Sequence, residues 1–339
     1  MELTTVADDE AVVHDGVEVH RYPDLEPDTA YEYDGFHFRT MARPPGELLC
    51  RFATVNDVHF GEVEAGLIEG MELGPTFSSE PGHDPYPEVM NRGAITEMQT
   101  LDDLAAVVVK GDLTSKGTIE EYDTFRSFYE PAFGDRLHVV RGNHDSYHGG
   151  TFASEAPFSV DLPGVVIAMI DTARHERANG HISAETLTWL RDLASGLVAN
   201  RDDRPILIMG HHHAWNPESN ERPENYFGIN PDDSEALIDV VAEHHNLRGY
   251  FAGHTHRNRA RRFGLTRDVP WVEVASVKEF PGAWAEYRVY ETGILQIMRR
   301  IGSPECMDWT EKTRQMYAGM YFEYSFGELT DRCFTISTR

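Results

Sequence analysis

The chain has 339 residues, of which 40% are hydrophobic, and a formal net charge of −27. This length suffices for one large domain with an appendage, and an acidic surface of this size argues against a nucleic-acid partner. No apolar run is long enough to cross a bilayer, no signal peptide is evident, and three cysteines stand in no metal-binding or redox spacing, so we expect a cytoplasmic protein with no membrane partner.

The first segment, residues 1–47, is rich in Asp, Glu and Pro. Two pieces alternate between polar and apolar residues, "GVEVHRY" and "AYEYDGFHFRT", which is typical of short strands. We expect an N-terminal acidic β-hairpin extension that is too small to be an independent domain. The stretch "ARPPGE" at 42–47 reads as a linker to the main domain.

One pattern then recurs along the chain. A short apolar, β-branched run ends abruptly in Gly, Asp, Asn or His, as expected for strands that are buried on both faces. These runs cover residues 48–55, 104–110, 136–141, 164–170, 204–209 and 248–252.

Amphipathic helices are predicted between several of these strands, over 88–101, 119–132, 184–198 and 233–245, with Ser183 as an N-cap. Alternating strands and helices predict an α/β domain, whose ligands bind beyond the carboxyl ends of the strands. The later segments 270–277, 285–291 and 294–300 are expected to be antiparallel strands that complete a second sheet.

Three further segments bear on the substrate site. The loops 60–87 and 214–231 are long for a compact domain and rich in Gly, Pro and Asn, so both are candidate walls of a substrate pocket. The aromatic stretch 315–329 is expected to pack on the core. Lining of the pocket and a contact in a homodimer are the alternatives.

Polar residues concentrate at the predicted strand ends. In an extended chain, residues i and i+2 point to the same side, so Asp57 and His59 could hold one ion, and His254 and His256 could do likewise. Either pair alone is weak evidence for a metal site. Three further motifs, "GD" at 111–112, "GNHD" at 142–145 and "GHHH" at 210–213, also follow strands, and five such motifs do not coincide by chance.

This ordered set resembles the calcineurin-like metallophosphoesterases over roughly residues 50–300, nearest to the bacterial cyclic-nucleotide phosphodiesterase branch. The resemblance implies a four-layer α/β/β/α sandwich of two mixed sheets, which the small N-terminal β extension precedes in the sequence. It places the catalytic domain at 48–300 and leaves 301–339 as a C-terminal aromatic segment that packs on it.

The resemblance also implies a site for two transition-metal ions. Asp57, His59 and His256 would bind one ion, Asn143, His211 and His254 the other, and Asp112 would bridge them. Mixed imidazole and oxygen ligation without thiolate suits Fe, Mn, Zn or Co, and does not choose among them.

Two further expectations concern histidines. The resemblance implies that His144, which follows Asn143, is not a metal ligand and protonates the leaving oxygen, a role that suits the pKa of imidazole. Asp145 is expected to orient the His144 ring or stabilise its charge. Within "GHHH", we expect His211 to be the ligand, with His212 as the alternative and His213 as an ordinary loop residue.

Other polar residues are expected to be structural. Asn56 either caps the backbone or contacts phosphate, and Asp171 is expected to support the site without binding metal. The remaining histidines considered are expected to face solvent, namely His83, His148, His175, His181, His244 and His245.

The predicted function is hydrolysis of a small phosphate ester. We expect a phosphodiesterase that acts on a small cyclic nucleotide by attack of a metal-bound hydroxide on phosphorus. A phosphomonoesterase or a nucleotide pyrophosphatase could use the same centre. A non-catalytic scaffold is disfavoured, because every expected motif residue is present.

Overall fold

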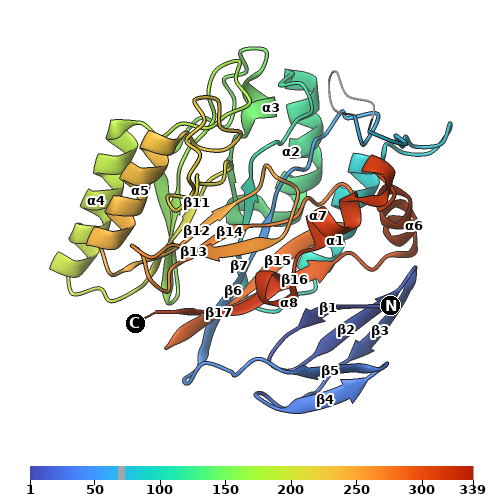
Figure 1. Cartoon of the computed structure of the whole chain (residues 1–339), viewed down its shortest axis with the longest axis horizontal. Helices are drawn as coiled ribbons and strands as arrows, with labels where there is room; N and C mark the ends of the chain where they lie inside the picture. Colours follow the sequence, from blue (N-terminus) through green and yellow to red (C-terminus); the bar gives the residue numbers. More distant parts are fainter. Residues whose placement is uncertain (68–72, 339) are drawn as a thin grey trace.

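Two six-stranded mixed sheets packed face to face form the centre of the computed structural model, which describes residues 1–67 and 73–338 (Figure 1). The first sheet has the order β17 (Cys333–Ser337), β16 (Gly293–Arg300), β15 (Ala283–Tyr290), β6 (Leu48–Val55), β7 (Leu104–Lys110) and β8 (Leu137–Val140). The second has the order β13 (Arg259–Arg262), β14 (Pro270–Glu273), β12 (Leu247–Ala252), β11 (Ile206–Met209), β10 (Val165–Met169) and β9 (Phe158–Leu162).

Helices cover the outer face of each sheet, on opposite sides of the molecule in Figure 1. The first sheet carries α1 (Tyr86–Met98), α2 (Ile119–Phe133), α6 (Pro304–Thr313) and α7 (Tyr321–Phe326), and the second carries α4 (Ala184–Ala199) and α5 (Pro231–Glu243). The short helices α3 (Asn143–Ser146) and α8 (Leu329–Arg332) and the 3₁₀ turns Gly134–Arg136 and Tyr317–Gly319 complete the set among the described residues. The predicted four-layer α/β/β/α sandwich is confirmed.

The residue pattern of the strands explains the layers. In β7, Val107 and Val109 pack against the helices, whereas Ala106 and Val108 contact the other sheet. Successive strand side chains point to opposite faces, so a strand between two apolar layers must be apolar throughout. The continuous hydrophobic runs in the sequence follow from this arrangement.

One predicted strand lies in a different sheet from the one expected. β14, within the segment 270–277, runs parallel to β12 in the second sheet, whereas β15 and β16 pair antiparallel in the first. The sequence pattern could not assign the sheet, because β14 pairs directly with β12, while β13, which lies between them in the sequence, pairs with the other side of β14 at the sheet edge.

The helix boundaries shift by a few residues from those predicted. Ser183 caps α4 as expected, accepting a hydrogen bond from the Thr186 backbone N–H at 3.1 Å. α5 begins at Pro231 rather than 233, because the Asn230 side chain caps it and proline suits the first helical position.

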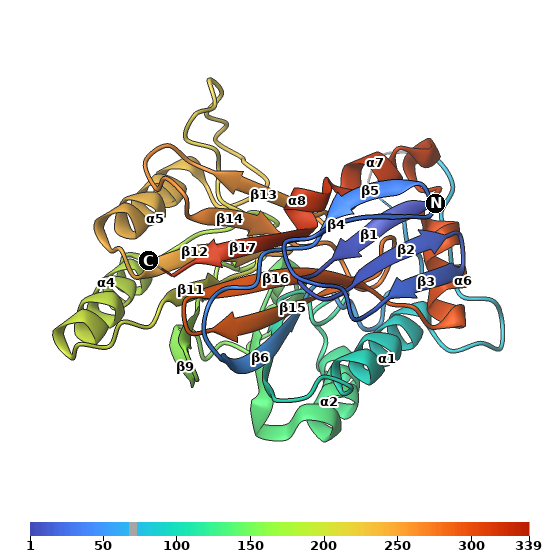
Figure 2. The ribbon, with the colours of Figure 1, turned by 90° about the horizontal axis from the view of Figure 1, so that it is seen from below.

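The N-terminal segment forms a three-stranded sheet, β1 (Glu2–Val6), β2 (Ala11–Asp15) and β3 (Glu18–Tyr22), and a hairpin, β4 (Ala30–Tyr33) and β5 (Phe36–Arg39). These strands lie beside β16, as Figure 2 shows. The Thr5 hydroxyl donates to the Met298 carbonyl at 2.7 Å, and Arg288 pairs with Asp8 at 2.6 Å. The extension is therefore fixed to the first sheet by polar contacts.

The described helices include none that is both long and apolar enough to cross a bilayer. Cys50, Cys306 and Cys333 are buried free thiols.

Candidate metal centre

Two groups of potential metal ligands lie at the carboxyl ends of the central strands. The first comprises Asp57, His59, Asp112 and His256, whose ligand atoms lie within 4.8 Å of one another. His59 Nε2 is 3.4 Å from Asp112 Oδ2, and His256 Nε2 is 3.4 Å from Asp57 Oδ1. Two carboxylates and two imidazoles at this spacing form a donor set that suits a divalent transition metal.

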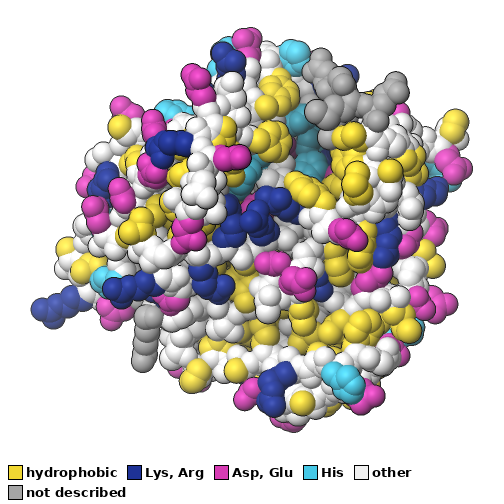
Figure 3. Space-filling view, in the orientation of Figure 1, with side chains coloured by type: hydrophobic (Ala, Val, Ile, Leu, Met, Phe, Trp, Pro, Cys, Tyr) yellow, Lys and Arg dark blue, Asp and Glu magenta, His cyan; other side chains and the backbone are white. Residues whose placement is uncertain are grey.

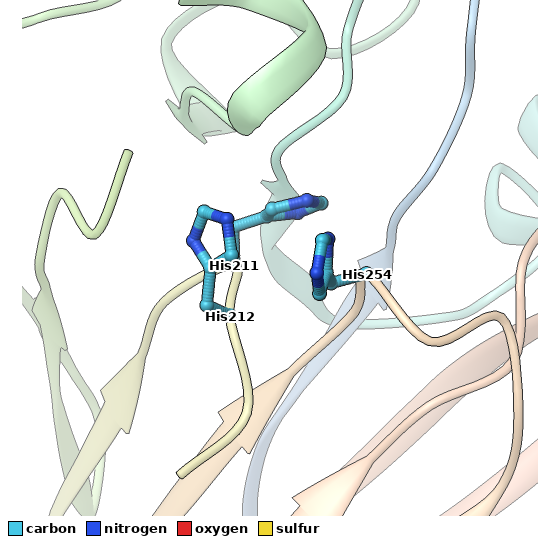
Figure 4. Close-up of side chains that lie close together, drawn as sticks. All are labelled: His211, His212 and His254. Atoms are coloured by element: carbon cyan, nitrogen blue, oxygen red, sulfur yellow. The ribbon is translucent and has the colours of Figure 1, made fainter. Parts of the chain in front are cut away.

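The second group comprises His211, His212 and His254, on the turns that follow β11 and β12 (Figure 4). His211 Nε2 lies 3.1 Å from Asn143 Oδ1 and 3.3 Å from Asp112 Oδ2. Asp112 therefore contacts histidines of both groups, and Asn143 adds a neutral oxygen to the second.

Five of these side chains stand on backbone in the left-handed region, with φ between 46° and 67°. These residues are Asp57, His59, Asp112, His254 and His256. Each such non-glycine residue costs about 1 kcal/mol or more, a strain that is typical of functional sites. The geometry expected for Asp57 and His59 was wrong in one respect, because the chain there is a turn rather than an extended strand.

Three of the candidate histidines donate one ring N–H to an oxygen behind them, which leaves the other ring nitrogen for a metal ion. The pairs are His211 Nδ1 with the Lys110 carbonyl (2.8 Å), His254 Nε2 with the Phe227 carbonyl (2.6 Å) and His256 Nδ1 with Glu279 (2.6 Å). This arrangement is how proteins fix the tautomer of metal-binding histidines, so the residues present fit two bound metal ions. His59 Nδ1 lies 3.1 Å from Glu62 as an ion pair, without a hydrogen bond.

The hydrogen bonds of Thr172 show how the ring nitrogens of His211 and His212 differ in protonation. The Thr172 hydroxyl oxygen accepts the backbone N–H groups of both histidines, at 3.3 and 3.1 Å, so its own hydrogen is left for His212 Nδ1 at 2.9 Å. A ring nitrogen that accepts a hydrogen bond carries no proton, and His212 Nε2 then carries it. Nε2 of neutral His212 therefore carries a proton, whereas Nε2 of His211 faces the oxygens of Asn143 and Asp112, two other candidate ligands.

His144 lines the cavity above the two groups. Its Nδ1 donates to the Ser115 carbonyl at 2.7 Å, and its backbone N–H donates to Asp112 Oδ1 at 2.9 Å. Burial lowers the pKa of His144, while the Asp112 carboxylate opposes that shift. Burial would raise the pKa of Asp112, but the nearby charges of His211 and His144 hold it well below its usual range.

The expected role of Asp145 is wrong. Its carboxylate accepts the backbone N–H groups of Leu113, Thr114 and Gly142 at 2.7–3.1 Å, and it does not contact the His144 ring. Burial and the Asp112 charge raise the pKa of Asp145 to about 6. Asp145 therefore holds together the loops that carry Asp112 and Asn143.

Asn56 and Asp171 have structural contacts. Buried Asn56 donates to Asp57 and accepts the Lys110 ammonium at 2.7 Å, so it supports a candidate ligand and does not line the cavity. Asp171 pairs with Arg141 at 2.7 Å.

The remaining histidines mostly lie where expected, since His83, His148, His175, His181 and His245 are exposed and His244 is half-buried. His213 is in a loop but buried, and its Nε2 pairs with the Tyr226 hydroxyl at 2.8 Å.

Sequence reasoning missed a buried charged network behind the first group. The Lys278 ammonium lies 2.5 Å from Glu62 and 3.1 Å from Glu279, the two carboxylates that hold the outer nitrogens of His59 and His256. Its one sequence signal is a Lys-Glu pair directly after the strand-like run 270–277. Lys278 thus balances the charge of both supporting carboxylates.

The cavity over the centre has a volume of about 400 Å³ and is visible in Figure 3 as a hollow with histidine side chains at its base. Asp112, Asn143, His144, His254 and His256 line it, and Phe227 contributes from the predicted loop 214–231. The described residues of loop 60–87 do not line it, and residues 68–72 of that loop lie outside the described part of the chain.

Residues 50–258, more than half of the chain, match the calcineurin-like phosphoesterase family model. The fold and the two donor groups define the class as a metal-dependent phosphoester hydrolase, an enzyme that acts on small phosphate esters. The chain belongs to the calcineurin-like phosphoesterase family, which uses a two-metal centre.

Relatives and one solved structure agree with this assignment. A probable cyclic nucleotide phosphodiesterase of Synechococcus sp. is 25% identical over 201 residues, 55% of this chain and 72% of that protein. The 3′,5′-cyclic adenosine monophosphate phosphodiesterase of Pseudomonas aeruginosa is 25% identical over 165 residues, 48% of this chain and only 57% of that enzyme. A dimetal phosphatase of Danio rerio shares the fold, with a TM-score of 0.59 at 13% identity over 86% of this chain and all of that one.

Proposed function

We propose that the protein is a cytoplasmic phosphodiesterase with a two-metal centre, and that it hydrolyses a small nucleotide, with cyclic nucleotides as the preferred class. The observation that carries the proposal is the pair of donor groups that meet at Asp112 beside His144, which belongs to neither group. The names of the Synechococcus and Pseudomonas relatives support the choice of substrate class.

In this proposal, Asp112 would bridge two ions, and the other ligands would divide between them as the family resemblance implies. Asp57, His59 and His256 would hold one ion, and Asn143, His211 and His254 would hold the other. The donor atoms would be Nε2 of His59, His211 and His256 and Nδ1 of His254, each without a proton when the ion is bound. When bound, Fe, Mn, Zn or Co ions at this centre would supply Lewis acidity to the phosphoryl group and to a water nucleophile.

His144 is the proposed general acid. The Ser115 carbonyl keeps the Nδ1–H in place, so the proton that is transferred must be held at Nε2, on the cavity side. The Asp112 carboxylate favours the charged imidazole, while burial favours the neutral one, and these opposed effects suit a group that must both hold and release a proton.

A substrate panel tests the proposal. Purified protein should contain close to two transition-metal ions per chain by elemental analysis. Its kcat/KM should be higher for 3′,5′- or 2′,3′-cyclic nucleotides than for p-nitrophenyl phosphate or ADP-ribose, across Mn, Fe, Zn and Co. If kcat/KM is instead highest for a monoester or a pyrophosphate, the protein is a phosphomonoesterase or a pyrophosphatase and not a phosphodiesterase. A protein that binds no metal and hydrolyses none of these would refute it.

Two variants test the residue roles. Asp112→Asn should lower the metal content below two, whereas the exposed Asp268→Asn serves as a matched carboxylate control. His144→Ala should keep both metals and lose about 10²–10⁴-fold in kcat. An unchanged rate on a substrate with a poor leaving group would remove His144 as the acid.

A further inference from the structure

The cavity above the metal centre has one wall built mainly of aromatic rings. Besides the candidate ligands and His144, it is lined by Tyr147, Phe227, Tyr317, Tyr321 and Tyr324, with the Thr255 backbone nearby. Three of these tyrosines come from the C-terminal segment 304–326, which lies outside the matched family region. A volume of about 400 Å³ is at the small end of ligand sites, which suits one small molecule.

Two of the rings are exposed to an unusual degree for large aromatic side chains. Phe227 is 56% exposed and Tyr324 is 44% exposed, although both line the cavity. Figure 3 shows hydrophobic side chains beside the hollow that contains the histidines. Exposed apolar rings at the mouth of a site commonly mark a binding surface.

Both exposed rings are held from behind. The Phe227 ring stacks on His254 with centroids 4.1 Å apart. The Tyr324 hydroxyl donates to the Thr255 carbonyl at 2.9 Å, and the Arg257 guanidinium lies 5.2 Å from the Tyr324 ring centroid. The rings are therefore pre-positioned, which lowers the entropy cost of binding a ligand between them.

The backbone at Tyr317, another tyrosine of the cavity wall, is strained. Tyr317 and Ala318 have φ values of 53° and 56°, two consecutive non-glycine residues in the left-handed region. This conformation costs about 1 kcal/mol or more per residue, and such strain is typical of functional segments. Tyr321, one turn further on, donates its hydroxyl hydrogen to Glu279, which holds His256. The segment is thereby tied to the metal centre.

We propose that Phe227 and the tyrosines of segment 304–326 form a subsite for the planar base of a nucleotide. The proposal rests on the proposed function, and it makes the preferred substrate a phosphoester that carries a nucleobase. The metal ions that the donor groups at the cavity floor would hold bind the phosphate, and the rings stack on the base. A sugar phosphate without a base gains nothing from the rings, because stacking requires a flat π face.

A pair of inhibitors that differ only by the base tests this subsite. Adenosine 5′-monophosphate and ribose 5-phosphate are compared as inhibitors of bis(p-nitrophenyl) phosphate hydrolysis by the Mn-loaded protein. We expect the nucleotide to bind about 10- to 100-fold more tightly. Equal inhibition constants would overturn the proposal.

Substitutions then assign the effect to the rings. Phe227→Leu and Tyr324→Leu should each reduce the preference for the nucleotide about tenfold, with the ribose 5-phosphate constant and the metal content unchanged. Tyr324→Phe should retain most of the preference, because the ring remains. Phe322→Leu, on the same helix but outside the cavity lining, is the matched control.

The outcomes separate this proposal from the proposed function. If Tyr324→Phe loses as much preference as Tyr324→Leu, the hydroxyl contact with Thr255 is responsible, and base stacking is refuted. If no metal supports hydrolysis of bis(p-nitrophenyl) phosphate, the proposed function fails. The two ligands are then compared by calorimetric titration of the Mn-loaded protein, and equal affinities would refute the subsite as well.

Discussion

Replacing Lys278 by Met tests the charged network behind the first donor group. The Lys278 side chain is only 5% exposed, and its ammonium lies between the carboxylates of Glu62 and Glu279. Methionine has a similar length but no charge. The substitution therefore leaves two buried carboxylates without their shared cation.

The size of the effect follows from this burial. Removing one partner of a buried ion pair costs about 3–5 kcal/mol. Unfolding entropy of about 2.1 cal/mol/K per residue gives roughly 0.7 kcal/mol/K for this chain, so Tm should fall by about 4–7 °C in metal-free protein. Cations bound by His59 and His256 would supply replacement positive charge close to both carboxylates. We expect the fall in Tm to be smaller in metal-loaded protein.

Differential scanning calorimetry of EDTA-dialysed and Mn-loaded samples measures both values. Lys278→Arg should preserve most of the stability because it preserves the charge. Lys312→Met removes a lysine that is 53% exposed and pairs with exposed Glu80, so it should shift Tm by no more than about 1 °C. The reasoning is refuted if Lys278→Met leaves Tm unchanged, or lowers it equally with and without metal.

Two other predictions concern histidines. His211→Gln should lower the metal content toward one ion per chain, whereas His212→Gln should keep both ions, as measured by elemental analysis. The opposite result would mean that the Thr172 hydrogen bonds do not set the tautomer of His212. Burial, with the nearby charges of Arg300 and Arg21, lowers the pKa of His14 to about 3. Between about pH 6.5 and 3, His14 is therefore protonated in the unfolded chain but not in the folded one. This group makes the free energy of unfolding fall by about 1.4 kcal/mol per pH unit as pH drops through that window. His14→Asn should flatten the pH dependence of the urea-unfolding free energy between pH 7 and 5 relative to the exposed His37→Asn, and identical slopes would contradict the pKa shift.

Much of the site could be predicted from the sequence, because local patterns carry it. Short buried strands must end in turns, and the carboxyl ends of neighbouring parallel strands meet at one edge of a sheet. Polar residues such as Asp57, Asp112 and His254, each directly after such a strand, were therefore expected to converge, and their side chains do lie together. The same pattern of strands and helices predicted an α/β domain, and the resemblance to the calcineurin-like metallophosphoesterases implied its four layers.

The tertiary structure alone decided which distant side chains support and surround that site. Lys278 contacts Glu62 across 216 residues, and Tyr321 contacts Glu279 across 42, contacts that no local pattern records. The choice between His211 and His212 likewise depends on Thr172, about 40 residues earlier. Such contacts arise from packing two sheets and their helices together, since an unpaired buried charge is costly and is compensated by whichever partner the fold brings near.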